Sequence, residues 1–131
     1  MAVEFPGQIV SLPCVTTGIG QYKFVNISTA GNVIRPVADG HVIGVTQTGT
    51  TGSTVDPKSI TVMLSGVSKL ALSTASTIGV GQVIAATTKG EAKILVAASI
   101  PAGQVIAGSS GGAGRVVSVL IAGVNVSTAS I

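Results

Sequence analysis

Short runs of β-branched and other apolar residues recur along the chain, and turn residues separate them. In Tyr22–Ile27 and Thr61–Ser65, apolar side chains alternate with polar or small ones. A period of two is typical of a strand with one buried and one solvated face. The pattern predicts short strands at Gln8–Leu12, Gln21–Ile27, His41–Thr46, Ser59–Ser65, Ser68–Leu72, Gln82–Ala86, Ala92–Val96, Gln104–Ala107 and Arg115–Ala122.

The predicted fold class is all-β, because no long segment keeps a helical period without interruption by Gly or β-branched residues. We expect one domain over residues 1–131, a compact β-sandwich or tulip-like barrel of short antiparallel strands. Gly81–Ala85 reappears 22 residues later as Gly103–Ala107. Each copy is typical of a turn that feeds a strand, and two copies are too few to indicate a solenoid.

Three segments lie outside these predicted strands. Residues 47–58 are rich in Thr and Gly, which predicts an exposed, flexible loop. Residues 1–7 form an N-terminal arm in which Phe5 precedes Pro6, an extended dipeptide. The closing segment, residues 124–131, is uncharged and strand-like. It either frays or docks on a neighbour by strand addition.

Composition adds a constraint on the core. Hydrophobic residues make up 46% of the chain, yet Phe5, Tyr22 and Phe24 are its only aromatic residues. Because aromatic rings supply much of the buried area of most cores, the interior of one chain should be thin. Burial between subunits would compensate, so we expect an oligomer.

Groups capable of catalysis are scarce. The carboxylates Glu4, Asp39, Asp56 and Glu91 are scattered singly, beside one His and one Cys. Acid–base catalysis and metal binding need clusters of such groups, so we expect no enzyme, no cofactor and no metal. Asp39 and His41 are close in sequence, but a solvated or salt-bridged pair is favoured over a catalytic one. Cys14 is the single cysteine, so it cannot form a disulfide within the chain, and it is expected to be a small buried hydrophobe.

The charge pattern and hydropathy argue against nucleic acid and membranes as partners. The seven basic residues are spread along the chain without a cluster, which argues against nucleic-acid binding. Apolar stretches fall short of the roughly 20 residues that span a bilayer, and the start lacks a secretory signal pattern. We therefore expect no membrane insertion and synthesis in the cytoplasm.

The order of several segments resembles the small capsid decoration, or cement, proteins of tailed bacteriophages. This resemblance rests on Phe5–Val10, Gln21–Val25, Ala30–Val33, His41–Val45, Ile60–Val67, Gly79–Ile84 and Val116–Leu120.

That resemblance implies a β-rich, trimeric domain on the outer surface of a phage head, bound to the major capsid protein. The resemblance implies no catalytic residues. The N-terminal residues Ala2, Val3, Glu4, Phe5 and Pro6 are the expected capsid contact. The alternative is a carbohydrate- or cell-surface-binding module, such as a head fibre or adhesin domain. Sugar sites stack aromatic rings on the ligand, and Tyr22 is the obvious exposed candidate for that role.

Overall fold

The computed structural model describes residues 5–14, 19–38, 40–49, 58–73, 78–95, 100–108 and 115–121. These residues contain strands and no helix, which confirms the all-β prediction. Every predicted strand overlaps an observed one, β1 and β4 fall outside the predicted ranges, and Val96 and Ala122 lie outside the described residues. The strands are β1 (Phe5–Pro6), β2 (Ile9–Cys14), β3 (Phe24–Ile27), β4 (Val33–Ile34), β5 (Gly44–Thr46), β6 (Lys58–Met63), β7 (Gly66–Ala71), β8 (Val83–Ala86), β9 (Ala92–Ile94), β10 (Gly103–Ala107) and β11 (Val116–Ile121).

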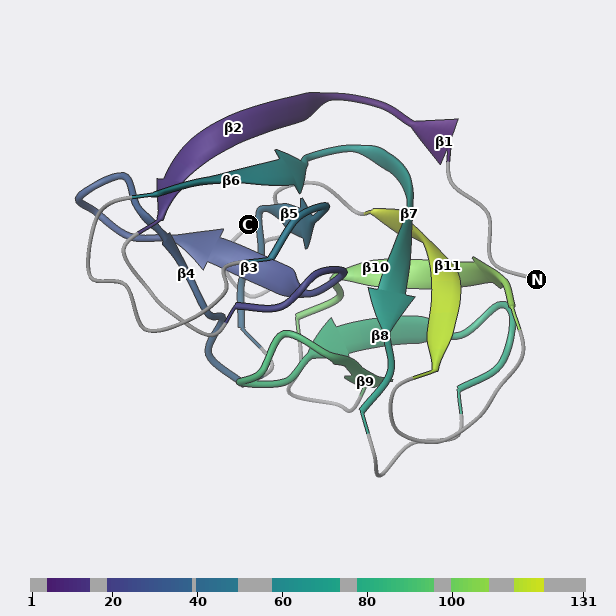
Figure 1. Cartoon of the computed structure of the whole chain (residues 1–131). Helices are drawn as coiled ribbons and strands as arrows, with labels where there is room; N and C mark the ends of the chain where they lie inside the picture. Colours follow the sequence, from purple (N-terminus) through teal and green to yellow (C-terminus); the bar gives the residue numbers. More distant parts are fainter. Residues whose placement is uncertain are drawn as a thin grey trace, which may run out of the picture.

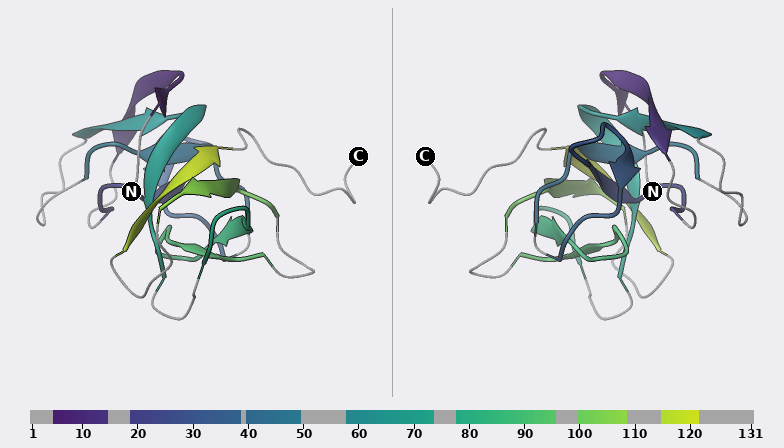
Figure 2. Two further views of the ribbon diagram at one scale, coloured as in Figure 1. Left: turned by 90° about the vertical axis from the view of Figure 1, so that its right-hand side faces the viewer. Right: turned by 90° about the vertical axis from the view of Figure 1, so that its left-hand side faces the viewer.

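The strands form two antiparallel sheets. One has five strands in the order β2-β6-β5-β3-β4, and the other has six in the order β1-β7-β11-β10-β8-β9. Figures 1 and 2 show the five-stranded sheet above the six-stranded one, with β2 arching over the top. The segment pair that looked repetitive in the sequence is also a neighbouring pair in space, since β8 and β10 lie side by side with Gln104 opposite Val83.

A second repeat, which the sequence analysis missed, organises the whole fold. The order β2-β6-β5-β3-β4 matches β7-β11-β10-β8-β9 strand for strand, and all of these neighbours pair antiparallel. We call residues 9–64 repeat 1 and residues 66–121 repeat 2. From Ile19 to Thr46, a residue of repeat 1 corresponds to the one 59 positions later, as Gly44 does to Gly103. The offset is 58 from Ile9 to Cys14 and 57 from Ile60 to Leu64, as the pairing of β2, β6, β7, β10 and β11 shows.

Equivalent backbone hydrogen bonds occur within each of the two repeats, in addition to the matching strand order. In the first hairpin, Ser28 N donates to Asn32 O at 2.8 Å, and in the second, Thr87 N donates to Glu91 O at 2.9 Å. The turns before these hairpins also match. Tyr22 N donates to Thr46 O, as Gly81 N does to Val105 O. Tyr22, with φ 58°, and Gly81, with φ 91°, both adopt the left-handed conformation.

Each repeat is a curled sheet whose edge strands meet. Cys14 Sγ on β2 lies 3.7 Å from Val33 O on β4, and the corresponding residues of repeat 2, Leu72 and Ala92, form a parallel bridge. We call the concave side of each sheet its inner face and the other side its outer face. The inner face of repeat 1 buries a small cluster: Cys14, Ile19, Val25, Val33, Ile60 and Val62.

The two repeats stack with the outer face of repeat 1 on the inner face of repeat 2. Phe24, Val45 and Met63 leave repeat 1 on its outer face and join the inner-face residues of repeat 2 in the larger core cluster. Phe24 is the only aromatic residue in that cluster, which agrees with the expected thin core. Its other members are Val42, Leu70, Leu72, Ile78, Ile84, Ala86, Ala92, Ala102, Val105, Val117, Val119 and Ile121.

Polar contacts frame the seam between the repeats. Lys23 Nζ lies 3.0 Å from Glu91 Oε2, with the two side chains about one-fifth exposed. Phe24 N donates to Gly90 O at 2.7 Å. Further along, Gln47 Nε2 donates to Ser68 Oγ at 2.9 Å. These contacts fix how far and at what angle repeat 1 enters the inner face of repeat 2.

The N-terminal strands tie the repeats together along one edge. β2 pairs with β6, with Ile9 opposite Met63. β1 continues the same register against β7, with Phe5 opposite Val67. Between the two ladders, Leu64 N donates to Gln8 O at 2.7 Å. A single chain segment therefore pairs with both sheets.

Replacement of Phe24 by Ala should destabilise the domain severely, because the ring is fully buried where the repeats meet. The expected loss is about 3–5 kcal/mol in the free energy of unfolding. Val83 occupies the corresponding position of repeat 2 and is 38% exposed, so Val83→Ala should cost less than about 1 kcal/mol. Urea unfolding followed by circular dichroism measures both. Equal losses would contradict the stacking described above.

Candidate interaction surfaces

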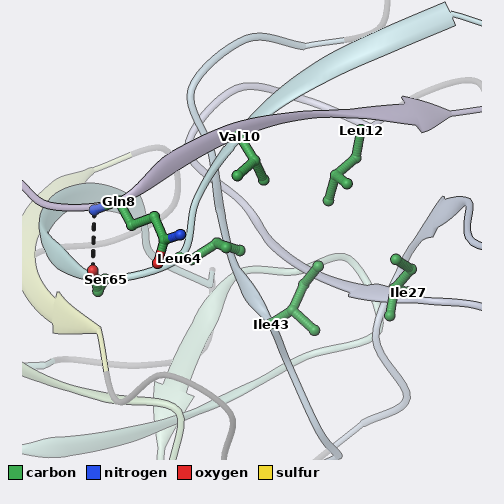
Figure 3. A pocket seen from close by; sticks show the side chains of 7 residues that line it. All are labelled: Gln8, Val10, Leu12, Ile27, Ile43, Leu64 and Ser65. Carbon is green, nitrogen blue, oxygen red and sulfur yellow. Dashed lines mark hydrogen bonds between the residues drawn. The ribbon is translucent and has the colours of Figure 1, made fainter.

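An apolar groove opens on the inner face of repeat 1. It holds about 500 Å³ and is lined by Gln8, Val10, Leu12, Ile27, Ile43, Leu64 and Ser65. Val10 and Leu12 project from β2 toward Ile43 and Ile27 on the opposite wall (Figure 3). At one end, Gln8 N donates to Ser65 Oγ at 3.0 Å. The groove therefore has aliphatic walls and a single polar corner, a chemistry suited to another apolar surface.

The groove exists because repeat 1 lacks the cover that repeat 2 has. The residues of repeat 2 that correspond to Val10, Leu12, Ile27, Ile43 and Leu64 are all buried, and they are Ser68, Leu70, Ala86, Ala102 and Ile121. In repeat 1, Ile27 remains 38% exposed, and the other four lining side chains are half-buried. The inner face of repeat 2 is thus covered within the chain, and the inner face of repeat 1 is open.

The outer face of repeat 2 is exposed, whereas the outer face of repeat 1 is covered. Phe24, Val45 and Met63 are buried in repeat 1, whereas their counterparts Val83, Gln104 and Leu120 are exposed. A shallow depression of about 220 Å³ runs over this face, lined by Val83, Pro101, Gly103, Gln104, Leu120 and Ile121. Leu120 is 46% exposed there. Within the part of the chain that the structure describes, two apolar surfaces are therefore open, one from each repeat.

A third depression is polar. It holds about 290 Å³ and is lined by Gly20, Lys23, Arg35 and Lys89. Lys23 is already paired with Glu91, and the other two cations are exposed surface residues. This arrangement is a local concentration of positive charge rather than a built anion site.

The structure describes only some of the residues weighed for chemistry. Cys14 is buried, as predicted, and is 2% exposed, whereas His41 is exposed and Asp39 lies outside the described residues. Among the described residues, no three His, Cys, Asp or Glu side chains gather where they could hold a metal ion. The same residues contain no helix that is long and apolar enough to cross a bilayer.

The predicted capsid contact and loop are only partly described. Phe5 and Pro6 form β1 at the edge of the six-stranded sheet, and Ala2, Val3 and Glu4 lie outside the described residues. Of the loop 47–58, residues 50–57 are likewise outside them, and Lys58 begins β6. Tyr22, the candidate for sugar stacking, is half-buried, and Lys69 Nζ lies 5.8 Å from its ring centroid.

Comparison with known proteins identified a fold likeness. No family model and no curated protein sequence matches this chain. Among solved structures, the N base of head fibre gp8.5 in bacteriophage phi29 is similar, with a TM-score of 0.68 and 14% sequence identity. The match covers 92% of this chain and 99% of that one. At this identity the likeness establishes a shared fold over nearly the whole domain.

A matched pair of glycines tests which surface is covered. Gly31 and Gly90 have φ of 86° and 80°, so an Ala at either position incurs roughly 1–2 kcal/mol of backbone strain. A Cβ on Gly90 would also strike Phe24 O and Lys23 Cβ, whereas one on Gly31 would meet nothing within 4 Å. We expect Gly90→Ala to lose about 1–3 kcal/mol more than Gly31→Ala. Thermal and urea unfolding of the two variants should show this difference, and equal losses would place the seam elsewhere.

Proposed function

We propose that this chain is a structural protein of a tailed-bacteriophage head, a decoration (cement) protein that binds the outer capsid surface and stabilises the major capsid lattice. The observation that carries the proposal is the fold likeness, over almost the full length of both chains, to the base of a phage head fibre. The resemblance of separate sequence segments to phage decoration proteins supports the same role independently.

The surfaces of the domain suit a binding role. Its two open faces are apolar and are lined by no charged residue, and the described residues bring no metal-binding cluster together. A protein added to a closed shell in many copies needs only a modest contact at each site, because linked sites act together. A trimer, which we propose as the assembled form, would join three such contacts.

The N-terminal arm, Ala2 to Pro6, is the proposed capsid contact. β1 is an edge strand of the six-stranded sheet, with β7 on one side. An edge strand offers backbone N–H and C=O groups to a further strand, so strand addition from a major capsid subunit is the contact that this geometry favours.

A fibre base is the second candidate, favoured by the name of the similar structure. In that case the domain would attach a further element to the head. Direct sugar binding has less support, because the Tyr22 ring is half-buried and lies beneath Lys69.

Cryo-microscopy of phage heads with and without this chain tests the role. We expect added density on the outer surface of decorated heads, together with a higher temperature of head disruption. Heads that bind none of the protein, or bind it without any gain in stability, would contradict the cement role. Density that continues outward from the domain into a fibre would favour the second candidate.

Deletion of Ala2–Pro6 should abolish head binding, because it removes the free edge strand together with the residues before it. Circular dichroism should still show β-structure, since β2 to β11 retain their pairing. A chain with an epitope inserted between residues 50 and 57 is the control, and it should fold and bind normally. If the deleted chain occupies heads as fully as the intact one, the arm has no part in binding.

A further inference from the structure

We propose that the apolar groove of repeat 1 receives the outer face of repeat 2 from a second copy of this chain. The contact is head-to-tail, since it joins two different surfaces. The inference does not rest on the proposed function, because it follows from the internal repeat alone.

The template for the contact lies inside the chain. There the outer face of repeat 1 covers the inner face of repeat 2, with Phe24, Val45 and Met63 entering the core. The same stacking step, applied once more, places the outer face of repeat 2 on the inner face of a repeat 1. We assign that repeat 1 to another copy, whose open inner face is the groove.

The side-chain sizes on the two pairs of faces compensate for each other. Within the chain, a bulky outer face that includes Phe24 and Met63 meets an inner face that contains Ala86 and Ala102. On the open surfaces the largest of these changes are reversed: Val83 replaces Phe24 on the outer face, where Gln104 and Leu120 replace Val45 and Met63, and the groove carries Ile27 and Ile43, the counterparts of the two alanines. The smaller Val83 side chain therefore faces a groove whose Ile27 and Ile43 are larger than the two alanines, which compensates for the lost volume of the Phe24 ring, as close packing requires.

The contacts that frame the internal seam have chemically matched counterparts on the open surfaces. The Gln47–Ser68 hydrogen bond corresponds to Ala107 and Val10, because Ala107 lies opposite Ser118 as Gln47 lies opposite Thr61, so a polar pair is replaced by an apolar pair on both sides. Ile106, the extra residue at the irregularity in β10, is 41% exposed, and Val10 lines the groove. A matched change on two distant surfaces is expected if they meet.

The ion pair has a counterpart as well. Lys23 and Glu91 correspond to Gln82 and Asn32, two amides that can hydrogen-bond to each other. Gln82 Oε1 already accepts a bond from Gly79 N at 2.6 Å, so its NH₂ group is the donor toward Asn32. Again both members change together, and the pair remains complementary.

The backbone approach is also available. Phe24 N donates to Gly90 O inside the chain, and Val83 and Gly31 hold the corresponding positions. Space is open around Gly31, as a docking position for another backbone requires. One bond cannot recur: Ala71 N donates to Tyr22 O, but the counterpart of Ala71 is Pro13, which has no N–H. The contact between copies is therefore weaker than the internal one.

Head-to-tail contacts close into a ring when the rotation between copies allows it and otherwise extend as a filament. A trimer built in this way would arrange six repeats around one ring, with each groove filled and each outer face of repeat 2 covered. The proposed trimer and the open surfaces thus have a common explanation.

Two single variants test the contact. Ile27→Asp places a charge in the groove, and Leu120→Asp places one on the outer face of repeat 2. Because both residues are partly exposed, at 38% and 46%, both variants should fold, as urea unfolding can verify. By light scattering, the unmodified chain should form assemblies, and each variant alone should associate at least about tenfold more weakly, since a carboxylate would be buried without a partner.

The decisive sample is an equimolar mixture of the two variants. Each dimer can form one intact contact, between the groove of the Leu120→Asp chain and the outer face of the Ile27→Asp chain. We expect dimers and nothing larger. Ile94→Asp is the control, because Ile94 is 40% exposed but lines neither the groove of repeat 1 nor the depression on the outer face of repeat 2. This variant should assemble like the unmodified chain.

A second pair of substitutions tests the polar correspondence. Asn32→Glu together with Gln82→Lys recreates between copies the ion pair found within the chain, so the double variant should assemble a few-fold more tightly, and salt should reduce the gain. Asn32→Lys together with Gln82→Lys should weaken assembly.

Three results would overturn the inference: an unmodified chain that stays monomeric at its highest soluble concentration, a mixture that forms no dimer, or assembly lost in only one of the two Asp variants. None of these results would by itself remove the capsid role, which head binding measures separately. Conversely, a head-to-tail assembly that ignores phage heads would leave this inference standing and contradict the proposed function.

Discussion

The fold depends on the insertion of one curled sheet into the concave face of another. A curled sheet of about 55 residues is at best marginally stable alone, and among the described side chains no inner-face residue of either core cluster is aromatic. Phe24, contributed by the outer face of repeat 1, supplies to repeat 2 the bulk that repeat 2 lacks. The seam between the repeats is consequently the main core, and the interior of repeat 1 is a smaller satellite cluster.

Glycine allows the strands to approach closely enough for this arrangement. A Cβ on Gly44 would strike Met63 O on the neighbouring strand, and one on Gly103, its counterpart in repeat 2, would lie 2.8 Å from Leu120 O. Both glycines are buried at the start of a strand whose partners are β-branched or long aliphatic residues. Small residues at these points permit the sharp curl of each sheet, so they shape the interiors that the bulky residues then fill.

The sequence predicted the fold class and strand positions well because both depend on local signals, namely the period of two and the turn residues between apolar runs. It did not reveal the repeat, since the matching positions keep backbone roles and not side chains. Ile19, Gly20, Gly31 and Gly44 are identical to Ile78, Gly79, Gly90 and Gly103, but Phe24 corresponds to Val83 and Tyr22 to Gly81. The echo between Gly81–Ala85 and Gly103–Ala107 pointed instead to two strands that pair with each other.

The apolar groove was beyond sequence reasoning for a related reason. Val10, Ile27 and Ile43 resemble ordinary core residues, and only the comparison with the buried Ser68, Ala86 and Ala102 of repeat 2 shows that they lack a cover. A signal was present in the sequence. At these inner-face positions repeat 1 has larger apolar residues than repeat 2. On the outer face, Phe24 of repeat 1 is likewise larger than Val83 of repeat 2. Detecting it requires the alignment of the two halves that the structure supplies.

A stack of two repeats necessarily leaves one inner face and one outer face at its ends. Proteins built from stacked repeats usually place polar side chains on such ends, which keeps single chains soluble. Here both ends are apolar instead: Ile27, Val83, Ile106 and Leu120 are each at least 38% exposed, and the groove walls are aliphatic apart from Gln8 and Ser65. Because the two ends carry matched substitutions of the same internal seam, their apolar character is better explained by selection for contact with each other than by tolerance of exposed aliphatic residues.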